Sequence, residues 1–374
     1  MSIKYTILKW YKQIVNSYYQ LITLFSPIRK EKVVFFLYRG SKLEGNLQMV
    51  FEELKKQFPS KEIYIQTSAK KVGLTILKDL WLIRDAETIL IDDYFLAGYL
   101  VTPRKGTRII QLWHATGAFK KFGLSTRNTQ FGPSEKYLEI LPIHQHYTAA
   151  YVSTDISAKY FSEAFGMSPT QIFAMGSPRA EQLMCHVAPP PVKFSHQKKN
   201  MTKILIAPTY RAGKVHQESL LRWTDEVQEI VKQLSKNTLL IIVLHPYENT
   251  RDWTPLMNHP QIYVDLQSSA NAWMPHVDAF ITDYSSAIFE FALFEKPLAH
   301  YIPDLEEYTK NRGFYRPIKE ITDGDLLHSR KQLIEWINQR HQHEHLNTER
   351  MVRENIGVVS GVTEKIVQHI FEPK

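Results

Sequence analysis

The sequence has almost no cysteine and no long apolar run. Cys185 is the only cysteine among 374 residues, which excludes an internal disulfide and a cysteine-based zinc cluster. The longest stretches without a polar residue, 94–101 and 239–244, are far shorter than the roughly 20 residues that a membrane-spanning helix needs. The sequence therefore predicts a chain that does not cross a bilayer and that needs no oxidising compartment.

Several catalytic motifs are also missing. The sequence contains no P-loop, GxGxxG, GxSxG or HExxH pattern. His144 and His146 lie close together, but no carboxylate is near them in sequence, so a metal site there is not favoured. We expect neither a metal ion nor a cofactor.

The chain carries an excess of positive charge. It has 46 Lys and Arg against 38 Asp and Glu, a formal net charge of +8, in an otherwise ordinary folded-protein composition. No block of five basic residues occurs and the charge is spread over both halves, which argues against a nucleic-acid partner. The binding partners that this positive net charge still favours are an anionic membrane surface and phosphate-bearing substrates.

Residues 1–30 contain no acidic residue. Apolar and aromatic residues recur there at a spacing that predicts one wide helix face, with lysines beside it. Such a helix is typical of a segment that lies in a membrane interface, and it can equally pack on the domain behind it. Both roles can hold at once. No cleavage site follows, so a secretory signal is not favoured.

Short apolar strands alternate with helices along the rest of the chain. This alternation predicts βαβ units and parallel sheets. We expect two Rossmann-like domains that face each other across a cleft, with ligands at the carboxyl ends of the strands. The expected parts are 1–30 (amphipathic segment), 31–190 (first domain), 200–325 (second domain) and 326–374 (helices packing across both). The expected strands are 32–38, 62–67, 88–91, 108–113, 147–152, 203–207, 239–244, 262–264, 279–282 and 298–301.

In the first half, polar residues follow the strand at 108–113. His114 is placed to act as a general base, although a polar loop histidine is the plainer interpretation. Lys120 and Lys121 follow within reach of a phosphate. Asp92 and Asp93 resemble a metal-binding pair, but one aspartate that caps a turn explains them more simply.

In the second half, three strands end in residues suited to phosphate. Thr209 and Arg211 follow the first of these strands, and an arginine there can clamp a phosphate or lie on the surface. His245 ends the most apolar strand and is either a site residue or a core histidine. The third segment combines a possible helix cap with hydroxyls that suit a phosphate, and a basic aromatic loop follows it. These last candidates are Thr282, Asp283, Ser285, Ser286 and Arg312.

These segments, in this order, resemble the CDP-glycerol glycerophosphotransferase family of wall teichoic acid synthesis. The resemblance rests on TILIDDYF, QLWHATGAFKKFGL, ILIAPTYR, VLHPY, ITDYSSAIFEFALFEKP and RGFY, and it extends from about residue 33 to about 320. It implies a GT-B-type α/β fold with an acceptor-binding first domain and a donor-binding second domain. The short priming enzymes of the family are the most similar in their segments at 88–95 and 111–124.

The resemblance also implies an activity. Glycerol phosphate would pass from CDP-glycerol to a hydroxyl of N-acetylmannosaminyl-N-acetylglucosaminyl-diphospho-undecaprenol, with release of CMP. His114 would be the base and His245 would stabilise the pyrophosphate, while Arg211, Thr282, Ser285, Ser286 and Arg312 would hold the donor phosphates. Asp283 would orient a ribose hydroxyl or a serine.

Alternatives to this activity stay open. A later glycerol- or ribitol-phosphate transferase of the same pathway shares most of these motifs, and a GT-B nucleotide-sugar glycosyltransferase shares the fold. With the N-terminal segment, the resemblance predicts a peripheral protein on the cytoplasmic face of the cell membrane.

Overall fold

The computed structural model describes residues 3–129, 132–209, 227–244, 253–339 and 345–372. The chain divides into two compact units. The first unit comprises residues 1–182 and 355–374, and the second comprises residues 183–354. The boundary expected at 190–200 therefore falls inside the second unit, and the tail expected as one segment at 326–374 is divided between the two units.

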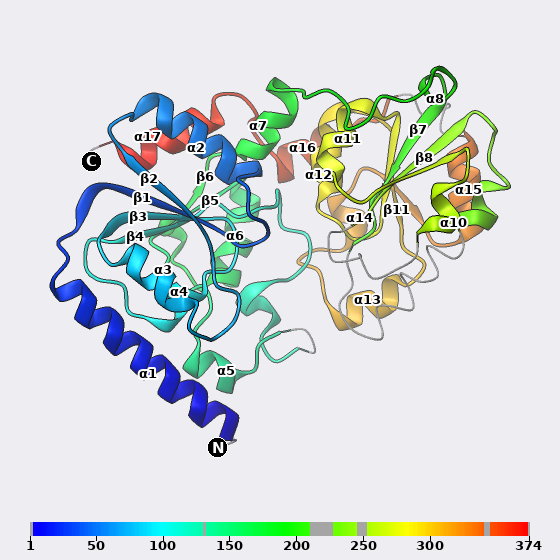
Figure 1. The fold of residues 1–374 in the computed structure, drawn as a ribbon. Helices are drawn as coiled ribbons and strands as arrows, with labels where there is room; N and C mark the ends of the chain where they lie inside the picture. Colours follow the sequence, from blue (N-terminus) through cyan, green and yellow to red (C-terminus); the bar gives the residue numbers. More distant parts are fainter. Residues whose placement is uncertain (1–2, 130–131, 210–226, 245–252, 340–344, 373–374) are drawn as a thin grey trace. The chain divides into compact units, whose positions relative to one another are not determined.

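The first unit contains a six-stranded parallel sheet in the order β2-β1-β3-β4-β5-β6 (Figure 1). The strand order reverses between β1 and β3, which marks the place where doubly wound sheets bind ligands. In β1 the last six residues are all buried, as expected for a parallel strand covered on both faces. The strands are β1 Arg29–Leu37, β2 Glu62–Thr67, β3 Ala86–Ile91, β4 Arg108–Gln111, β5 Ala149–Val152 and β6 Ile172–Ala174.

The second unit contains another six-stranded parallel sheet, in the order β12-β11-β10-β7-β8-β9. Numbered within the unit, this is the strand order of the Rossmann fold, and it reverses between β7 and β10. The expected class, two Rossmann-like α/β domains, is confirmed. The sequence did not predict β6 or β12, which are short. The strands are β7 Thr202–Ile206, β8 Thr238–Val243, β9 Ile262–Asp265, β10 Ala279–Thr282, β11 Leu298–Tyr301 and β12 Asp325–Leu327.

Helices cover both faces of each sheet (Figure 1). In the first unit α2 and α17 lie on one face of the sheet, and α1, α3 and α4 lie on the other. The helices of the first unit are α1 Ile3–Leu24, α2 Gly45–Gln57, α3 Ile76–Ile83, α4 Leu96–Leu100, α5 Glu135–Ile140, α6 Asp155–Phe165 and α17 Val362–Phe371, and α7 Pro178–Cys185 crosses into the second unit. Those of the second are α8 His196–Lys199, α10 Thr254–Met257, α11 Ala270–Trp273, α12 Ala287–Phe291, α13 Leu305–Asn311, α14 Ile318–Ile321, α15 Arg330–Gln339 and α16 Glu349–Asn355.

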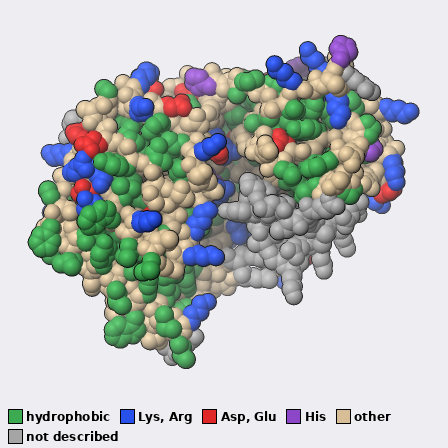
Figure 2. All heavy atoms as spheres, viewed as in Figure 1, with side chains coloured by type: hydrophobic (Ala, Val, Ile, Leu, Met, Phe, Trp, Pro, Cys, Tyr) green, Lys and Arg blue, Asp and Glu red, His purple; other side chains and the backbone are tan. Residues whose placement is uncertain are grey.

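Helix α1 has one packed face and one exposed face. Val15 and Tyr19 are buried against the first unit, and the Lys12 ammonium donates to the Ile140 carbonyl at 2.8 Å. The opposite stripe leaves large apolar side chains in the open, and Figure 2 shows hydrophobic side chains gathered over this region. The exposed apolar side chains of the helix are Ile3, Ile7, Trp10, Ile14, Leu21 and Leu24. No described helix, α1 included, is both long and apolar enough to span a membrane.

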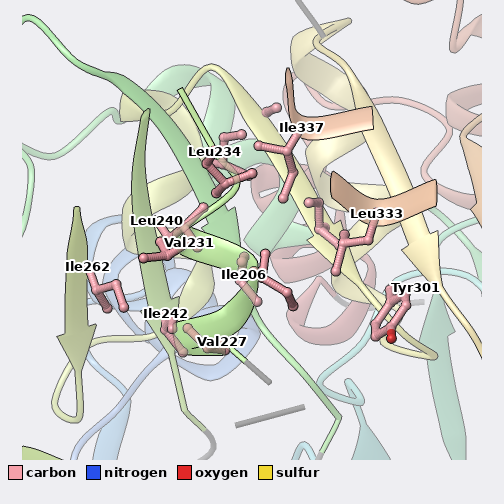
Figure 3. Packing of buried hydrophobic residues seen from close by; sticks show 14 of the residues in the cluster. Ile206, Val227, Val231, Leu234, Leu240, Ile242, Ile262, Tyr301, Leu333 and Ile337 are labelled. Atoms are coloured by element: carbon pink, nitrogen blue, oxygen red, sulfur yellow. The ribbon is translucent and has the colours of Figure 1, made fainter. Parts of the chain in front are cut away.

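Each unit has its own apolar core. In the second unit, side chains of β7, β8 and β9 meet those of α15 and of residues 227–234, as Figure 3 shows for Ile206, Ile242 and Ile337. In the first unit, the end of the chain completes the core, because Ile366 and Ile370 of α17 pack with Leu47 and Leu54 of α2. The Glu181 carboxylate accepts the backbone N–H groups of Val362 and Thr363 and so caps α17. The C-terminal helix is therefore an integral part of the first unit.

The packing of α17 predicts that the first unit depends on it for stability. Ile366 is fully buried, so Ile366→Ala should lower the free energy of unfolding by about 2–5 kcal/mol in urea denaturation. Lys365→Ala, at the neighbouring exposed position, is the matched control and should change it by less than about 0.5 kcal/mol. Equal effects of the two substitutions would contradict the packing described here.

Candidate active site

A small pocket lies where the strand order of the first unit reverses. Its volume is about 100 Å³, and it is formed by the turn after β1, the start of α2 and the residues that follow β3 and β4. Arg39, Lys42 and Arg179 contribute positive charge to it, Glu44 and Asp92 are its acidic residues, and His114 adds an imidazole. This combination of cations with an imidazole suits an anionic ligand.

The turn after β4 points His114 into this pocket. Trp113 has a φ of 51°, in the left-handed region that residues with a side chain rarely adopt. The turn is held in place by Asn46, whose side-chain amide donates to the carbonyls of Leu112 and Trp113, each at 2.9 Å. The Arg179 guanidinium donates to the His114 carbonyl, also at 2.9 Å. The strained backbone is thus over-determined by its neighbours, as is common at functional sites.

The hydrogen bonds of His114 define its tautomer. Nδ1 lies 2.7 Å from the carbonyl oxygen of Asp92, which can only accept, so Nδ1 carries the proton. Nε2 lies 2.7 Å from Nη2 of Arg39, which can only donate, so Nε2 presents a lone pair. His114 is therefore a neutral imidazole whose basic nitrogen faces the pocket.

The surroundings favour the neutral form. Burial lowers the pKa of His114 to about 4, an effect that the Asp93 carboxylate opposes and the Arg39 guanidinium reinforces. Burial also raises the pKa of Asp92 to about 7, and the adjacent Asp93 carboxylate adds to that rise. Burial alone would raise the pKa of Asp93, but His114 and Arg39 outweigh it, and the pKa is lowered. Asp93 is thus an ionised carboxylate that lies next to His114 and Arg39.

Arg39, Asp93 and Arg179 are site residues that sequence reasoning missed. Nε of Arg39 donates to Oδ2 of Asp93 at 2.6 Å, which holds the guanidinium against His114. Oδ1 of Asp93 accepts the N–H of Tyr94 at 2.8 Å, so it also caps a turn, as the sequence indicated. Arg39 follows β1 and Arg179 comes shortly after β6. Their position after a strand end is the feature of the sequence that could have identified them as site residues.

The two lysines that follow His114 have a different setting. Lys120 and Lys121 are half-buried in the loop after β4 and do not contribute to the lining of the His114 pocket. Their contact with a phosphate stays a prediction. In the described part of the chain no group of three or more His, Cys, Asp or Glu side chains is arranged to hold a metal ion.

In the second unit the candidate residues gather where its strand order reverses. β7 and β10 are paired neighbours, and Thr209 and Asp283 follow them. Oδ1 of Asp283 accepts the Thr209 N–H at 2.8 Å and the Tyr284 N–H at 2.7 Å. The carboxylate is 2% exposed and joins the ends of the two strands. These two contacts are with backbone N–H groups, and the ribose hydroxyl or serine that the sequence suggested as its partner stays a prediction.

The hydroxyl residues after β10 divide into buried and accessible ones. Thr282 is fully buried, and its hydroxyl donates to the Ala207 carbonyl at 2.6 Å, so it ties β10 to the end of β7. Ser285 and Ser286 are half-buried at the start of α12, and Oγ of Ser285 accepts the Ala287 N–H at 3.3 Å. The two serines are the better placed of the three to meet a ligand.

Stacked aromatic rings join the region around Arg312 to the segment that follows β10. The rings of Tyr284 and Tyr308 stack with centroids 3.8 Å apart, and Phe314 packs on both. The Tyr284 hydroxyl donates to the Asp304 carboxylate at 2.8 Å. Arg312, at the end of α13 between Tyr308 and Phe314, is half-buried and belongs to the same part of the second unit. Arg211 and His245 lie outside the described residues, and their predicted roles stay predictions.

The fold and the position of the candidate residues are those of α/β proteins with ligand sites at strand ends. Both units place polar and charged side chains at the carboxyl ends of parallel strands, where the strand order reverses, as α/β proteins that bind nucleotides and phosphates do. The wall teichoic acid polymerase TagF shares this architecture, with a TM-score of 0.75 at 17% identity over 96% of this chain and 93% of that one. The UDP-GlcNAc 2-epimerase of Methanocaldococcus jannaschii matches with a TM-score of 0.60 at 13% identity over 91% of this chain and 100% of that one.

Sequence comparison identifies the family. The model of the CDP-glycerol:poly(glycerophosphate) glycerophosphotransferase family matches residues 18–372. The chain therefore belongs to this family of teichoic acid phosphotransferases, as its motifs predicted. It is 35% identical to the teichoic acid ribitol-phosphate primase of Bacillus spizizenii in an alignment 352 residues long that covers 88% of each chain. It is 28% identical to the teichoic acid glycerol-phosphate primase of Bacillus subtilis over 76% of this chain and 73% of that one.

The contact between Arg39 and His114 predicts how the histidine titrates. Arg39→Ala removes a cation from Nε2 and leaves the Asp93 carboxylate without its arginine, so the pKa of His114 should rise from about 4 towards its ordinary value of roughly 6.5. NMR titration of histidine-labelled protein measures this shift. Arg127→Ala, an exposed arginine of the same unit, should leave it unchanged. A pKa of His114 that does not rise in the Arg39 variant would contradict the arrangement.

Proposed function

We propose that the chain transfers a polyol phosphate from a CDP-linked polyol to a hydroxyl of a lipid-linked teichoic acid acceptor and releases CMP. The observation that carries the proposal is the neutral His114, whose Nε2 lone pair faces a cationic pocket at a strand end. A base of this kind is what the attack of a hydroxyl on a phosphorus atom requires. Family membership supplies the chemical class of the reaction.

The proposed reaction proceeds by single displacement. The acceptor hydroxyl replaces Nη2 of Arg39 at Nε2 of His114 and gives its proton to that nitrogen. The acceptor oxygen then bonds to the β-phosphorus, and the bond from this phosphorus to the bridging oxygen breaks, so that CMP leaves with that oxygen. Arg39 remains anchored on Asp93 through Nε and can turn its other nitrogens to the charge that develops on the phosphoryl oxygens. Ser285, Ser286, Arg312, Arg211 and His245 are proposed to hold the donor.

Two donors are candidates. CDP-glycerol is the donor predicted from the sequence, and the description of the family names it. CDP-ribitol is favoured by the higher identity to a ribitol-phosphate primase, 35% compared with 28% for a glycerol-phosphate primase. Equal concentrations of the two, offered together to the purified protein with acceptor, separate them by the polyol that is incorporated.

The proposed acceptor is N-acetylmannosaminyl-N-acetylglucosaminyl-diphospho-undecaprenol, as in a priming step. The alternative is the same lipid already carrying a glycerol phosphate, as in a later step. Offering each lipid separately and measuring CMP release distinguishes the two steps. Transfer of a sugar from a nucleotide sugar, without use of either CDP-polyol, would defeat the phosphotransferase proposal.

Replacement of His114 tests the proposed base. His114→Gln keeps a polar side chain but removes the proton acceptor, so the rate of CMP release should fall by about 10²–10⁴-fold. His186→Gln, an exposed histidine away from the pocket, is the control and should retain full activity. Turnover by the His114 variant at the rate of the control would exclude His114 as the base.

We also propose that the protein is peripheral on the cytoplasmic face of the membrane, bound through the exposed stripe of α1. Ile7→Asp with Trp10→Asp removes two apolar side chains that are each 63% exposed, which should weaken binding to anionic vesicles by roughly 100-fold in flotation assays. Val187→Asp with Val358→Asp is the matched control, because both valines are exposed outside α1. Unchanged flotation of the Ile7 and Trp10 variant would show that another surface binds the membrane.

A further inference from the structure

A second pocket in the first unit carries a concentration of positive charge. It lies at the carboxyl end of β2, has a volume of about 420 Å³ and is lined by Lys70, Lys71 and Lys78. Ser68 and Thr75 add hydroxyl groups to its wall. Nothing in the proposed reaction at His114 uses this pocket.

The one acid that lines the pocket is engaged with the protein. Asp79 is 1% exposed, and its carboxylate accepts the Ala69 N–H at 2.8 Å, which shapes the loop that carries the lysines. Burial raises the pKa of Asp79 to about 6. Within the described residues none of Lys70, Lys71 and Lys78 forms a salt bridge. Three lysines therefore line this space with one aspartate, an excess of positive charge that suits a ligand of two or more negative charges.

The lysine pocket adjoins the His114 pocket. The Lys70 ammonium lies 5.3 Å from the centroid of the Tyr38 ring, and Tyr38 lines the His114 pocket. The ends of β2 and β4 are three strands apart in the sheet, a separation of roughly 14 Å. The half-buried rings of Tyr38 and Tyr94 lie between them, with centroids 6.2 Å apart. Such a separation is comparable with the length of a disaccharide, and aromatic rings are surfaces on which sugars pack.

The lysine pocket also adjoins the exposed apolar surface. The Tyr11 hydroxyl of α1 donates to the Gly73 carbonyl at 2.8 Å and accepts the Gly73 N–H at 3.1 Å, which joins the helix to the loop of the pocket. Leu74 is 84% exposed beside this contact, and Trp81 is 54% exposed one helical turn after Lys78. Lysines at the rim of an exposed apolar surface are placed to meet phosphates at the depth of lipid headgroups.

We propose that Lys70, Lys71 and Lys78 form the subsite for the diphosphate of a membrane lipid, with the sugars of that lipid running over Tyr38 and Tyr94 to His114. The inference rests on the proposed function for the identity of the group at His114. It adds a location for the charged end of the acceptor, on the side of the unit where α1 lies.

The test measures binding without any donor, so that it stays separate from turnover. The probe is a phosphatidylcholine vesicle that carries undecaprenyl diphosphate, compared with one that carries phosphatidylglycerol at equal negative charge. The readout is the ratio of the two affinities, which removes general attraction to an anionic surface. For Lys71→Ala with Lys78→Ala this ratio should fall about tenfold, because two charged contacts to the diphosphate are lost.

Two further variants serve as controls. Lys71→Arg with Lys78→Arg keeps the charges and should restore much of the ratio, and Lys55→Ala with Lys159→Ala removes two exposed lysines elsewhere in the unit and should leave it unchanged. All four positions are exposed, so thermal melting should match that of the unaltered protein. Lys70 is retained because it packs on Tyr38.

The possible outcomes are distinct. A ratio that is unchanged in the Lys71→Ala and Lys78→Ala variant overturns the subsite. Inorganic pyrophosphate is added at the same concentration as the undecaprenyl diphosphate in the vesicles. If it displaces the unaltered protein, the pocket binds a free diphosphate and the lipid assignment is overturned. Failure of the proposed polyol transfer would instead appear as absent CMP release, with the ratio of vesicle affinities unaffected.

Discussion

The buried charge of Asp93 is the constraint on which the first pocket depends. A carboxylate that is 3% exposed at the end of a strand is stable only if cations and N–H groups surround it. Arg39 supplies the cation and the Tyr94 N–H supplies a hydrogen bond. Because Arg39 is held there, its Nη2 lies 2.7 Å from Nε2 of His114 and fixes the direction of the lone pair on that nitrogen. Satisfying one buried charge therefore orients the proposed base.

The second unit repeats this arrangement with different partners. Asp283 and Asp93 each follow a strand beside the reversal of strand order, and each accepts the N–H of the tyrosine that comes next. Asp93 binds a side chain that follows β1, whereas Asp283 binds the backbone of Thr209 after β7. Each unit also has a histidine whose Nδ1 lies 2.7 Å from a backbone carbonyl oxygen. His114 pairs with Asp92 in the first unit, and His300 pairs with Asp283 in the second. The common device is an aspartate that fixes two strand ends, and the two units add different chemistry to it.

Much of the fold could be predicted from the sequence, because buried parallel strands are nearly continuous apolar runs. The segments 32–38 and 239–244 are such runs, and both are strands. β6 and β12 were missed because they have three residues each, too few for a pattern. α17 was placed in a tail expected to pack across both domains, since helical periodicity shows that a helix has an apolar face but not which surface covers that face.

The site was predicted in part, for a related reason. His114 and Asp283 follow strands inside recognisable motifs, so sequence order was sufficient to select them. Arg39, Asp93 and Arg179 come from three separate strand ends, and only the sheet order brings them together around His114. The sequence also could not show that the Thr282 hydroxyl donates to the Ala207 carbonyl. The sequence around a threonine is the same whether its hydroxyl contacts a ligand or a backbone carbonyl.

The central claim is that His114 is a neutral imidazole with its proton on Nδ1 and its lone pair on Nε2. Nitrogen-15 chemical shifts of the His114 ring at pH 7 measure this tautomer directly. We predict a protonated Nδ1 and an unprotonated Nε2, since Nδ1 faces the Asp92 carbonyl and Nε2 faces the Arg39 guanidinium. A proton found on Nε2, or on both nitrogens, would contradict it.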